Sequence, residues 1–249
     1  MRRRILANYL SGNLERRTLL FILVPLIFVF YFGTLALAAF VFPESYDWRS
    51  SVISNLLSPR RNPQFHWLAS IGLSSAALLA TPFGGYISSR LRRASRLGAK
   101  TGMVCFVGGI AALVLAAIVV PRHSHPVVGP LGVHEILARL SALALGLGVL
   151  CFCWCALGVA YRSRFSQPFF NRALVLCWTL LMILIVLTLT TCLCSELFRR
   201  TGILEASPFY KTLRHSPLWR LAFWEWLGSA AGFLFLASAA FLLPDREND

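Results

Sequence analysis

The sequence predicts an all-α polytopic membrane protein, a bundle of six transmembrane helices with both termini in the cytoplasm. Hydrophobic residues make up 57% of the 249 residues, and the mean hydropathy is +0.67. A soluble chain of this length needs less apolar sequence for its core. The apolar residues gather in blocks, most of which reach the roughly 20 residues needed to cross the hydrocarbon of a bilayer. We interpret residues 1–249 as a single membrane domain.

Six spans follow one another along the chain, separated by polar segments. They cover residues 18–42, 66–88, 101–120, 133–160, 171–195 and 219–243. The apolar stretch of the first span is too long for a cleavable signal peptide, whose apolar core has roughly 7–15 residues. The third span is the shortest, but no charged residue interrupts it. The first, fourth and fifth are long enough that they must tilt or project from the bilayer.

The Lys and Arg residues predict the orientation of the bundle. Fourteen of the 24 fall on the side of the two termini and nine on the opposite side, with Arg139 inside a span. The positive-inside rule then places both termini in the cytoplasm, and the basic 89–100 loop is the strongest indicator. We expect a bacterial cytoplasmic (inner) membrane. The net charge of +14 sits in short loops beside the spans, which favours membrane lipids over nucleic acid as partners.

Cysteines and small residues inside the spans predict helix packing. All seven cysteines fall in spans, which favours buried apolar packing, with metal or redox chemistry as the alternative for the Cys151-Phe-Cys-Trp-Cys155 tract. Gly228 and Gly232 in the sixth span have the spacing that permits close helix contact, and so do Ala144 and Gly148 in the fourth.

Three outer segments, residues 43–65, 121–132 and 196–218, connect the spans on the predicted extracytoplasmic side. In the first, Asp47 is a candidate helix N-cap. A surface-lying helix that ends near Pro59 is expected there, with its apolar face made of Val52, Ile53, Leu56 and Leu57. The third segment is long for a connection in a compact bundle, which is typical of functional or disordered loops. A partner protein could dock on these outer loops.

All five histidines fall at the outer end of the predicted bundle: His66, His123, His125, His134 and His215. Histidine suits proton transfer and metal binding near neutral pH. Glu135 and Arg139 are spaced to share one face of the fourth span. An ionisable residue at the depth of Arg139 is costly in a membrane and therefore indicates a functional site.

Three interpretations of this cluster stay open. In the first, His123, His125 and His134 bind a divalent metal such as zinc, and Glu135 serves as general base. In the second, the site holds no metal, and His134 and Glu135 perform acid–base chemistry on a lipid headgroup. Its phosphate would then be held by Arg139 and the arginines of the outer loops. In the third, the same residues only cap helix ends and reach the headgroup region.

The layout resembles a family of six-pass prokaryotic membrane proteins known as domain of unknown function 998. The matching residues are Ile53-Ser54-Asn55-Leu56 and His134, with Gly129 and Gly132 ahead of the histidine. The chain departs from the family's pattern at Asn55, where an acidic residue is more usual, and at Arg122-His123, where acidic residues often follow the third span. The resemblance implies a six-span fold in which Ser54, Asn55 and His134 face one site.

The function predicted from these residues is coarse. We expect an integral membrane protein with a polar His/Glu/Arg site at its extracytoplasmic face that binds or acts on a lipid headgroup. As an enzyme it would be a hydrolase or transferase of a membrane lipid, with His134 and Glu135 as the acid–base pair and Arg139 as the anion clamp. The alternatives are a lipid-binding or assembly scaffold without enzyme activity and, third, a transporter.

Overall fold

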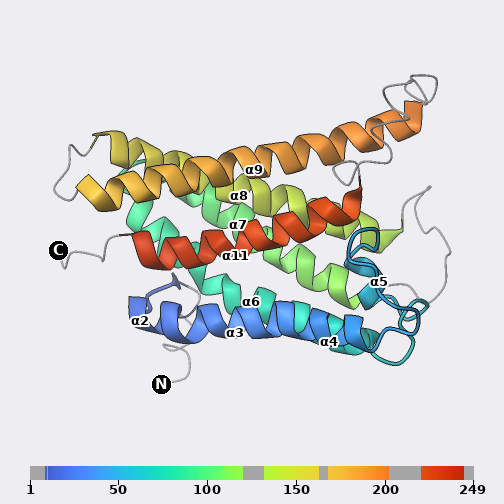
Figure 1. The fold of residues 1–249 in the computed structure, drawn as a ribbon. Coiled ribbons are helices and arrows are strands. Elements are labelled where there is room, and N and C mark those ends of the chain that lie inside the picture. The colour runs from blue at the N-terminus through green and yellow to red at the C-terminus, as the bar shows by residue number, and fades with distance from the viewer. Residues whose placement is uncertain (1–8, 10, 120–131, 163–167, 202–219, 244–249) are drawn as a thin grey trace.

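The computed structural model describes residues 9, 11–119, 132–162, 168–201 and 220–243, and all the regular elements in these ranges are helical (Figure 1). The first span is built from α2 (Arg16–Thr18), η1 (Leu19–Leu23), α3 (Val24–Phe28), η2 (Val29–Gly33) and α4 (Thr34–Phe40), followed by the short α5 (Ser54–Leu57). The remaining long helices are α6 (His66–Leu91), α7 (Arg96–Ile118), α8 (Val133–Arg162), α9 (Pro168–Thr201) and α11 (Leu221–Leu242). We call the end of the bundle where α4 ends and α6 begins the outer end, and the opposite end the inner end.

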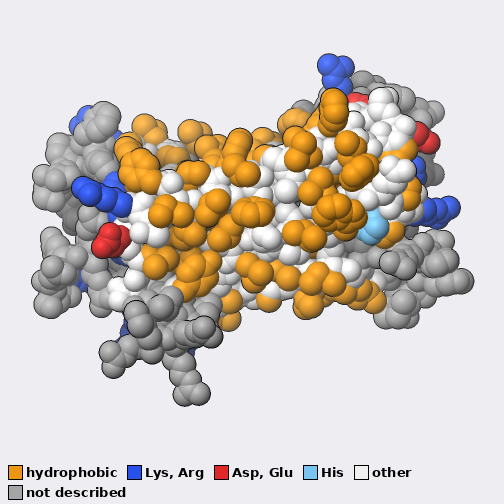
Figure 2. All heavy atoms as spheres, turned by 90° about the horizontal axis from the view of Figure 1, so that it is seen from below, with side chains coloured by type: hydrophobic (Ala, Val, Ile, Leu, Met, Phe, Trp, Pro, Cys, Tyr) orange, Lys and Arg blue, Asp and Glu red, His pale blue; other side chains and the backbone are white. Residues whose placement is uncertain are grey.

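Within the described residues, six helices are long and apolar enough to cross a membrane, as the sequence predicts. Their membrane-length segments are Arg16–Phe40, His66–Leu91, Arg96–Ile118, Val133–Gly158, Arg172–Thr191 and Leu221–Leu242. Large apolar side chains such as Phe21 and Trp154, 75% and 73% exposed, point away from the protein. Figure 2 shows hydrophobic side chains covering the middle of one face, with charged side chains towards its two ends. Such a belt suits a lipid environment.

The helices pack in a closed ring. The first span packs on α6, α6 on α7, α7 on α8, α8 on α9 and α9 on α11, and α11 returns to contact η1 and α3. The main core lies inside this ring and includes Phe83, Phe152, Trp178 and Phe235. Trp178 donates a hydrogen bond from Nε1 to Ser238 Oγ (3.0 Å), which joins α9 to α11.

The first span contains two π-helical stretches around Pro25. Proline lacks the N–H that a regular helix needs, so the carbonyl one turn earlier loses its usual donor. Transmembrane helices accommodate such a residue by local changes in hydrogen-bonding register. Pro25 lies at the second position of α3, immediately after η1. The span nevertheless stays continuous from Arg16 to Phe40.

A second proline, Pro82, lies inside α6 without ending it. Its missing N–H leaves the carbonyl of Leu78 without a helical donor, and the hydroxyl of Tyr9 donates to this carbonyl at 3.1 Å. The N-terminal segment comes this close because Gly12 (φ +67°) and Gly85 carry no side chain. A Cβ on Gly85 would lie 2.3 Å from the backbone of Ser11. The Thr81-Pro-Phe-Gly-Gly85 stretch of α6 thus forms the docking point of the N-terminal segment.

Both ends of the described chain lie at the inner end. Arg16 donates from Nε to the carbonyl of Ala240 (3.0 Å), and its terminal nitrogen donates to the carbonyl of Phe241. Carbonyls in the last turn of a helix have no partner within the helix, and a basic side chain satisfies them. The start of the first span and the end of α11 therefore lie on the same side, as six spans require. That this side is cytoplasmic remains a prediction from the charge bias.

Of the two small-residue pairs predicted for helix contact, the one with Gly148 lies at a close helix crossing and the one with Gly228 and Gly232 does not. Gly148 in α8 lies against the backbone of Phe106 in α7, and Ser141 donates to the carbonyl of Gly109 at 2.9 Å. By contrast, a Cβ on Gly232 of α11 would meet nothing within 4 Å among the described residues, and one on Gly228 would make only ordinary contact at 3.8 Å. The close crossing therefore forms between α7 and α8 and not at the GxxxG pair.

Candidate functional site

His134 lies in the first turn of α8 and is half-buried. Its Nδ1 lies 2.8 Å from the carbonyl oxygen of Ala116, in the last turn of α7. A carbonyl only accepts hydrogen bonds, so Nδ1 carries the proton of the neutral imidazole, and the lone pair of Nε2 is left to act as a base or ligand. The same bond is also what a purely structural histidine would make, because it satisfies a carbonyl at a helix end.

Only some of the other predicted site residues of this cluster lie in the described part of the chain. Glu135 and Arg139 are both exposed and lie one helical turn apart on α8. His123, His125 and His215 lie outside the described residues, so the predicted three-histidine metal site stays a prediction. Among the side chains that are described, no group of three or more His, Cys, Asp or Glu residues is placed to hold a metal ion.

The outer segment 41–65 folds as a compact cap on the bundle. Ile53, Leu56 and Leu57 are buried against α4 and α6 in a second apolar cluster that includes Leu35 and Leu73. Three of the four residues of the predicted apolar face are thus buried, whereas Val52 is half-buried. The helix is short, Ser54–Leu57, so that only Leu56 and Leu57 of this face lie within it. It packs into the protein and does not lie on the surface.

Polar contacts within the cap fix its shape. Asp47 does not cap α5: it accepts a hydrogen bond from the backbone N–H of Arg49 (3.0 Å) and another from the hydroxyl of Ser50. These two bonds hold the pKa of Asp47 below its ordinary value. Asn62, fully buried, donates to the carbonyl of Leu56 within α5 at 3.3 Å. The predicted N-cap at Asp47 was wrong because its carboxylate closes a local turn instead.

Glu225 joins this cap to the sixth span. Its Oε2 accepts a hydrogen bond of 2.7 Å from the backbone N–H of Ile53, the residue before α5. One turn further along α11, Ser229 pairs with the hydroxyl of Tyr31 at 2.5 Å and thereby ties α11 to the first span. The outer end is thus held by bonds between segments far apart in the sequence. In the sequence, Glu225 lies between Trp224 and Trp226, and nothing in this local pattern predicts Ile53 as its partner.

Tyr46 lies beside this junction and is buried. Its hydroxyl donates to two backbone carbonyls, that of Ser51 at 2.8 Å and that of Val52 at 3.0 Å. Burial raises the pKa of Tyr46, the charge of Glu225 raises it further, and the indole of Trp226 opposes the shift. The neutral phenol is therefore the stable form in the fold.

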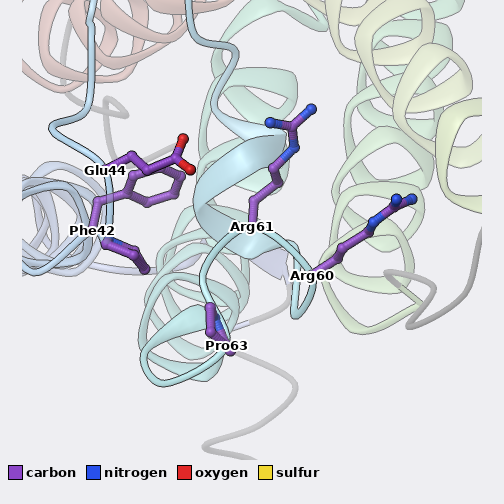
Figure 3. A pocket seen from close by; sticks show the side chains of 6 residues that line it. Phe42, Glu44, Arg60, Arg61 and Pro63 are labelled. Carbon is purple, nitrogen blue, oxygen red and sulfur yellow. The ribbon is translucent and has the colours of Figure 1, made fainter.

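A surface cavity of about 520 Å³ is formed by residues of the cap at the outer end. It is lined by Phe42, Pro43, Glu44, Arg60, Arg61 and Pro63. Figure 3 shows Phe42 and Glu44 on one side, with Arg61 and Arg60 extending from a turn on the other. The sequence suggested Arg60 and Arg61 as phosphate ligands, but it gave no sign that they share a cavity with residues 42–44.

The cysteines of the spans behave as packing residues. The five whose side chains are described are all free thiols: Cys105, Cys151, Cys153, Cys155 and Cys177. Cys153 and Cys155 are buried, and Gly98 of α7 leaves the room that the sulfur of Cys155 occupies. These contacts support the packing interpretation of the Cys151–Cys155 tract.

No known protein family, curated protein or solved structure matches the chain. The resemblance to domain of unknown function 998 therefore stays a prediction, although the six long apolar helices agree with its layout. By helix length and hydropathy, the chain is a multi-pass membrane protein.

Proposed function

We propose that the protein binds the phosphate of a membrane-lipid headgroup in the cavity at its outer end. The observation that carries this proposal is the presence of two exposed arginines, Arg60 and Arg61, in the wall of one cavity. Guanidinium groups donate two parallel hydrogen bonds to phosphate oxygens and are therefore well suited to such a ligand.

The place of the cavity in the chain supports a lipid as the ligand. Its residues 42–44 begin two residues after Phe40, where the first span ends, and Pro63 stands three residues before His66, where α6 begins. The lining residues thus lie where two apolar helices leave the hydrocarbon, which is the level of lipid headgroups. Phe40 is 88% exposed and Trp67 50% exposed, and aromatic side chains at this level contact lipid.

The test compares lipids that differ only in phosphate. Purified full-length protein in detergent is mixed with phosphatidylglycerol or with diacylglycerol of the same acyl chains, and bound lipid is measured by native mass spectrometry. We expect retention of phosphatidylglycerol by the wild type and by the control variant Arg49→Gln. Arg49 is exposed in the same outer segment but does not line the cavity.

The double variant Arg60→Gln/Arg61→Gln is expected to lose this preference. An exposed charge pair contributes up to about 1 kcal/mol, so two pairs correspond to roughly 25-fold weaker binding. Equal retention of phosphatidylglycerol by the double variant and the wild type would refute the proposal.

An enzymatic role is the second candidate, and the hydrogen bond between His134 and Ala116 favours it. Metal-binding histidines commonly donate their second ring N–H to a backbone carbonyl, as His134 does. The test is the metal content of the purified protein and of the His134→Ala variant, measured by elemental mass spectrometry. Near-stoichiometric zinc that the variant loses would support a metal-assisted hydrolase or transferase. Equal metal content in the two proteins would exclude His134 as a ligand.

A further inference from the structure

The wall of the outer cavity carries charges of both signs. Arg60 and Arg61 are accompanied by the carboxylate of Glu44. In the part of the chain that the structure describes, no hydrogen bond or ion pair joins Glu44 to either arginine. Figure 3 shows the two kinds of charge on separate sides of the cavity, Glu44 beside the ring of Phe42 and the arginines across from them. The cavity therefore has a cationic part and an anionic part that do not neutralise each other by contact.

Each part fits a different group of one ligand. A phosphate is held by guanidinium groups. A primary ammonium donates hydrogen bonds to a carboxylate and is attracted to the face of an aromatic ring such as that of Phe42. A ligand with only a phosphate would leave Glu44 facing like charge, whereas one with a phosphate and a nearby ammonium complements both sides.

We infer that the cavity is selective for a zwitterionic headgroup of the phosphoethanolamine type, with the phosphate at Arg60 and Arg61 and the primary ammonium at Glu44. This inference rests on the proposed function and adds the headgroup class to it. The ligand is the lipid, because the cavity lies where the first span and α6 leave the apolar belt. Glu44 acts as the specificity-determining residue, since it is the one lining residue with a carboxylate to pair with the ammonium.

The experiment is a competition between lipids with identical acyl chains. Phosphatidylethanolamine and phosphatidylglycerol are added in equal amounts to the purified full-length protein, and the ratio of bound lipids is read by native mass spectrometry. We expect the wild type to retain more phosphatidylethanolamine. Glu44→Gln should lower the ratio of phosphatidylethanolamine to phosphatidylglycerol about fivefold, the effect of one exposed charge pair. Phosphatidylcholine, whose quaternary ammonium cannot donate a hydrogen bond, should bind more weakly than phosphatidylethanolamine.

A matched control separates this effect from a general change of charge. Glu15→Gln removes another exposed carboxylate, one at the inner end that does not line the cavity, and should leave the ratio unchanged. Thermal unfolding of both variants checks that they fold, which is expected because both side chains are exposed. An equal fall of the ratio in Glu15→Gln would overturn the assignment of Glu44.

The outcomes distinguish this inference from the proposed function. If the wild type prefers phosphatidylglycerol, or binds the two lipids equally, the headgroup class is wrong while phosphate binding stands. If it retains neither lipid above diacylglycerol, both proposals fail. The last measurement adds soluble phosphoethanolamine, which should displace the bound lipid only when it is in large excess. Binding of the soluble compound as tightly as the lipid would show that the ligand is not a membrane lipid.

Discussion

Replacing Gly148 with alanine is expected to force α7 and α8 apart. A Cβ at this position would lie 2.8 Å from the backbone nitrogen of Phe106, 3.1 Å from its Cα and 3.0 Å from the carbonyl oxygen of Gly102. All three atoms belong to the backbone of α7, so no side-chain rotation relieves the contact. Only a shift of one helix against the other makes room.

The expected magnitude follows from two opposing effects. Overpacking of a close contact costs about 1–3 kcal/mol. The change from glycine to alanine returns about 1 kcal/mol through helix propensity. The net loss at Gly148 is therefore roughly 0–2 kcal/mol for alanine, and leucine at the same position should cost more because it adds three further carbons to the contact.

Gly232→Ala is the matched control, because a Cβ there meets no described atom within 4 Å. It makes the same chemical change in a helix of similar apolar character, so only the propensity gain remains. The assay is thermal unfolding in detergent, followed by tryptophan fluorescence. With about 2–4 °C in Tm per kcal/mol, Gly148→Ala should unfold several degrees below Gly232→Ala. A Gly148→Ala protein that unfolds at or above the temperature of Gly232→Ala would refute the close crossing of α7 and α8.

Three further changes test the contacts at the two ends of the bundle. Tyr9→Phe leaves the carbonyl of Leu78 without its donor and should destabilise the protein by about 1–2 kcal/mol; an unchanged unfolding temperature would contradict this. Glu225→Leu removes the acceptor for the Ile53 amide and should speed hydrogen exchange there roughly tenfold, whereas Glu225→Gln should preserve most of the protection. Burial raises the pKa of Tyr46 above its ordinary value of 10.0, so its contribution to stability is full below that value and is lost as the pH rises towards the folded-state pKa. When unfolding is measured up to about pH 11, Tyr46→Phe should lose less stability at alkaline pH than the wild type. Equal losses of stability would argue against this role.

The outer cap shows where sequence reasoning was incomplete. The apolar pattern at Ile53, Leu56 and Leu57 correctly indicated an apolar face, since that pattern depends on the local period of a helix, but the expected surface-lying helix packs into the protein. Aspartate is a residue type favoured at helix N-caps, yet the carboxylate of Asp47 accepts hydrogen bonds from Arg49 and Ser50. What stabilises the chain before α5 is Glu225 from the sixth span, far away in the sequence, and no local pattern predicts such a contact.

The candidate site shows the same division. The sequence placed Arg60 and Arg61 at the outer end together with His134, and the structure keeps them there. That the two arginines share a cavity wall with Glu44 follows only from the way the segment after α4 meets the turn before α6. The partner of His134, the carbonyl of Ala116, likewise depends on how α7 and α8 pack.

The sequence by itself indicated a multi-pass membrane protein with six apolar spans, and the described part of the chain has six helices long and apolar enough to cross a membrane. The sequence could indicate this because crossing hydrocarbon requires a continuous apolar stretch of fixed minimum length, which any single segment displays alone. Only the tertiary structure decided which small residues form a helix crossing, because Gly148 and Gly232 have similar apolar surroundings in the sequence and differ only in what faces them. In lipid there is no hydrophobic driving force between helices, so their contacts depend on shape and on polar partners such as Glu225 and Ile53. Which polar groups become partners is therefore decided only when the helices pack together.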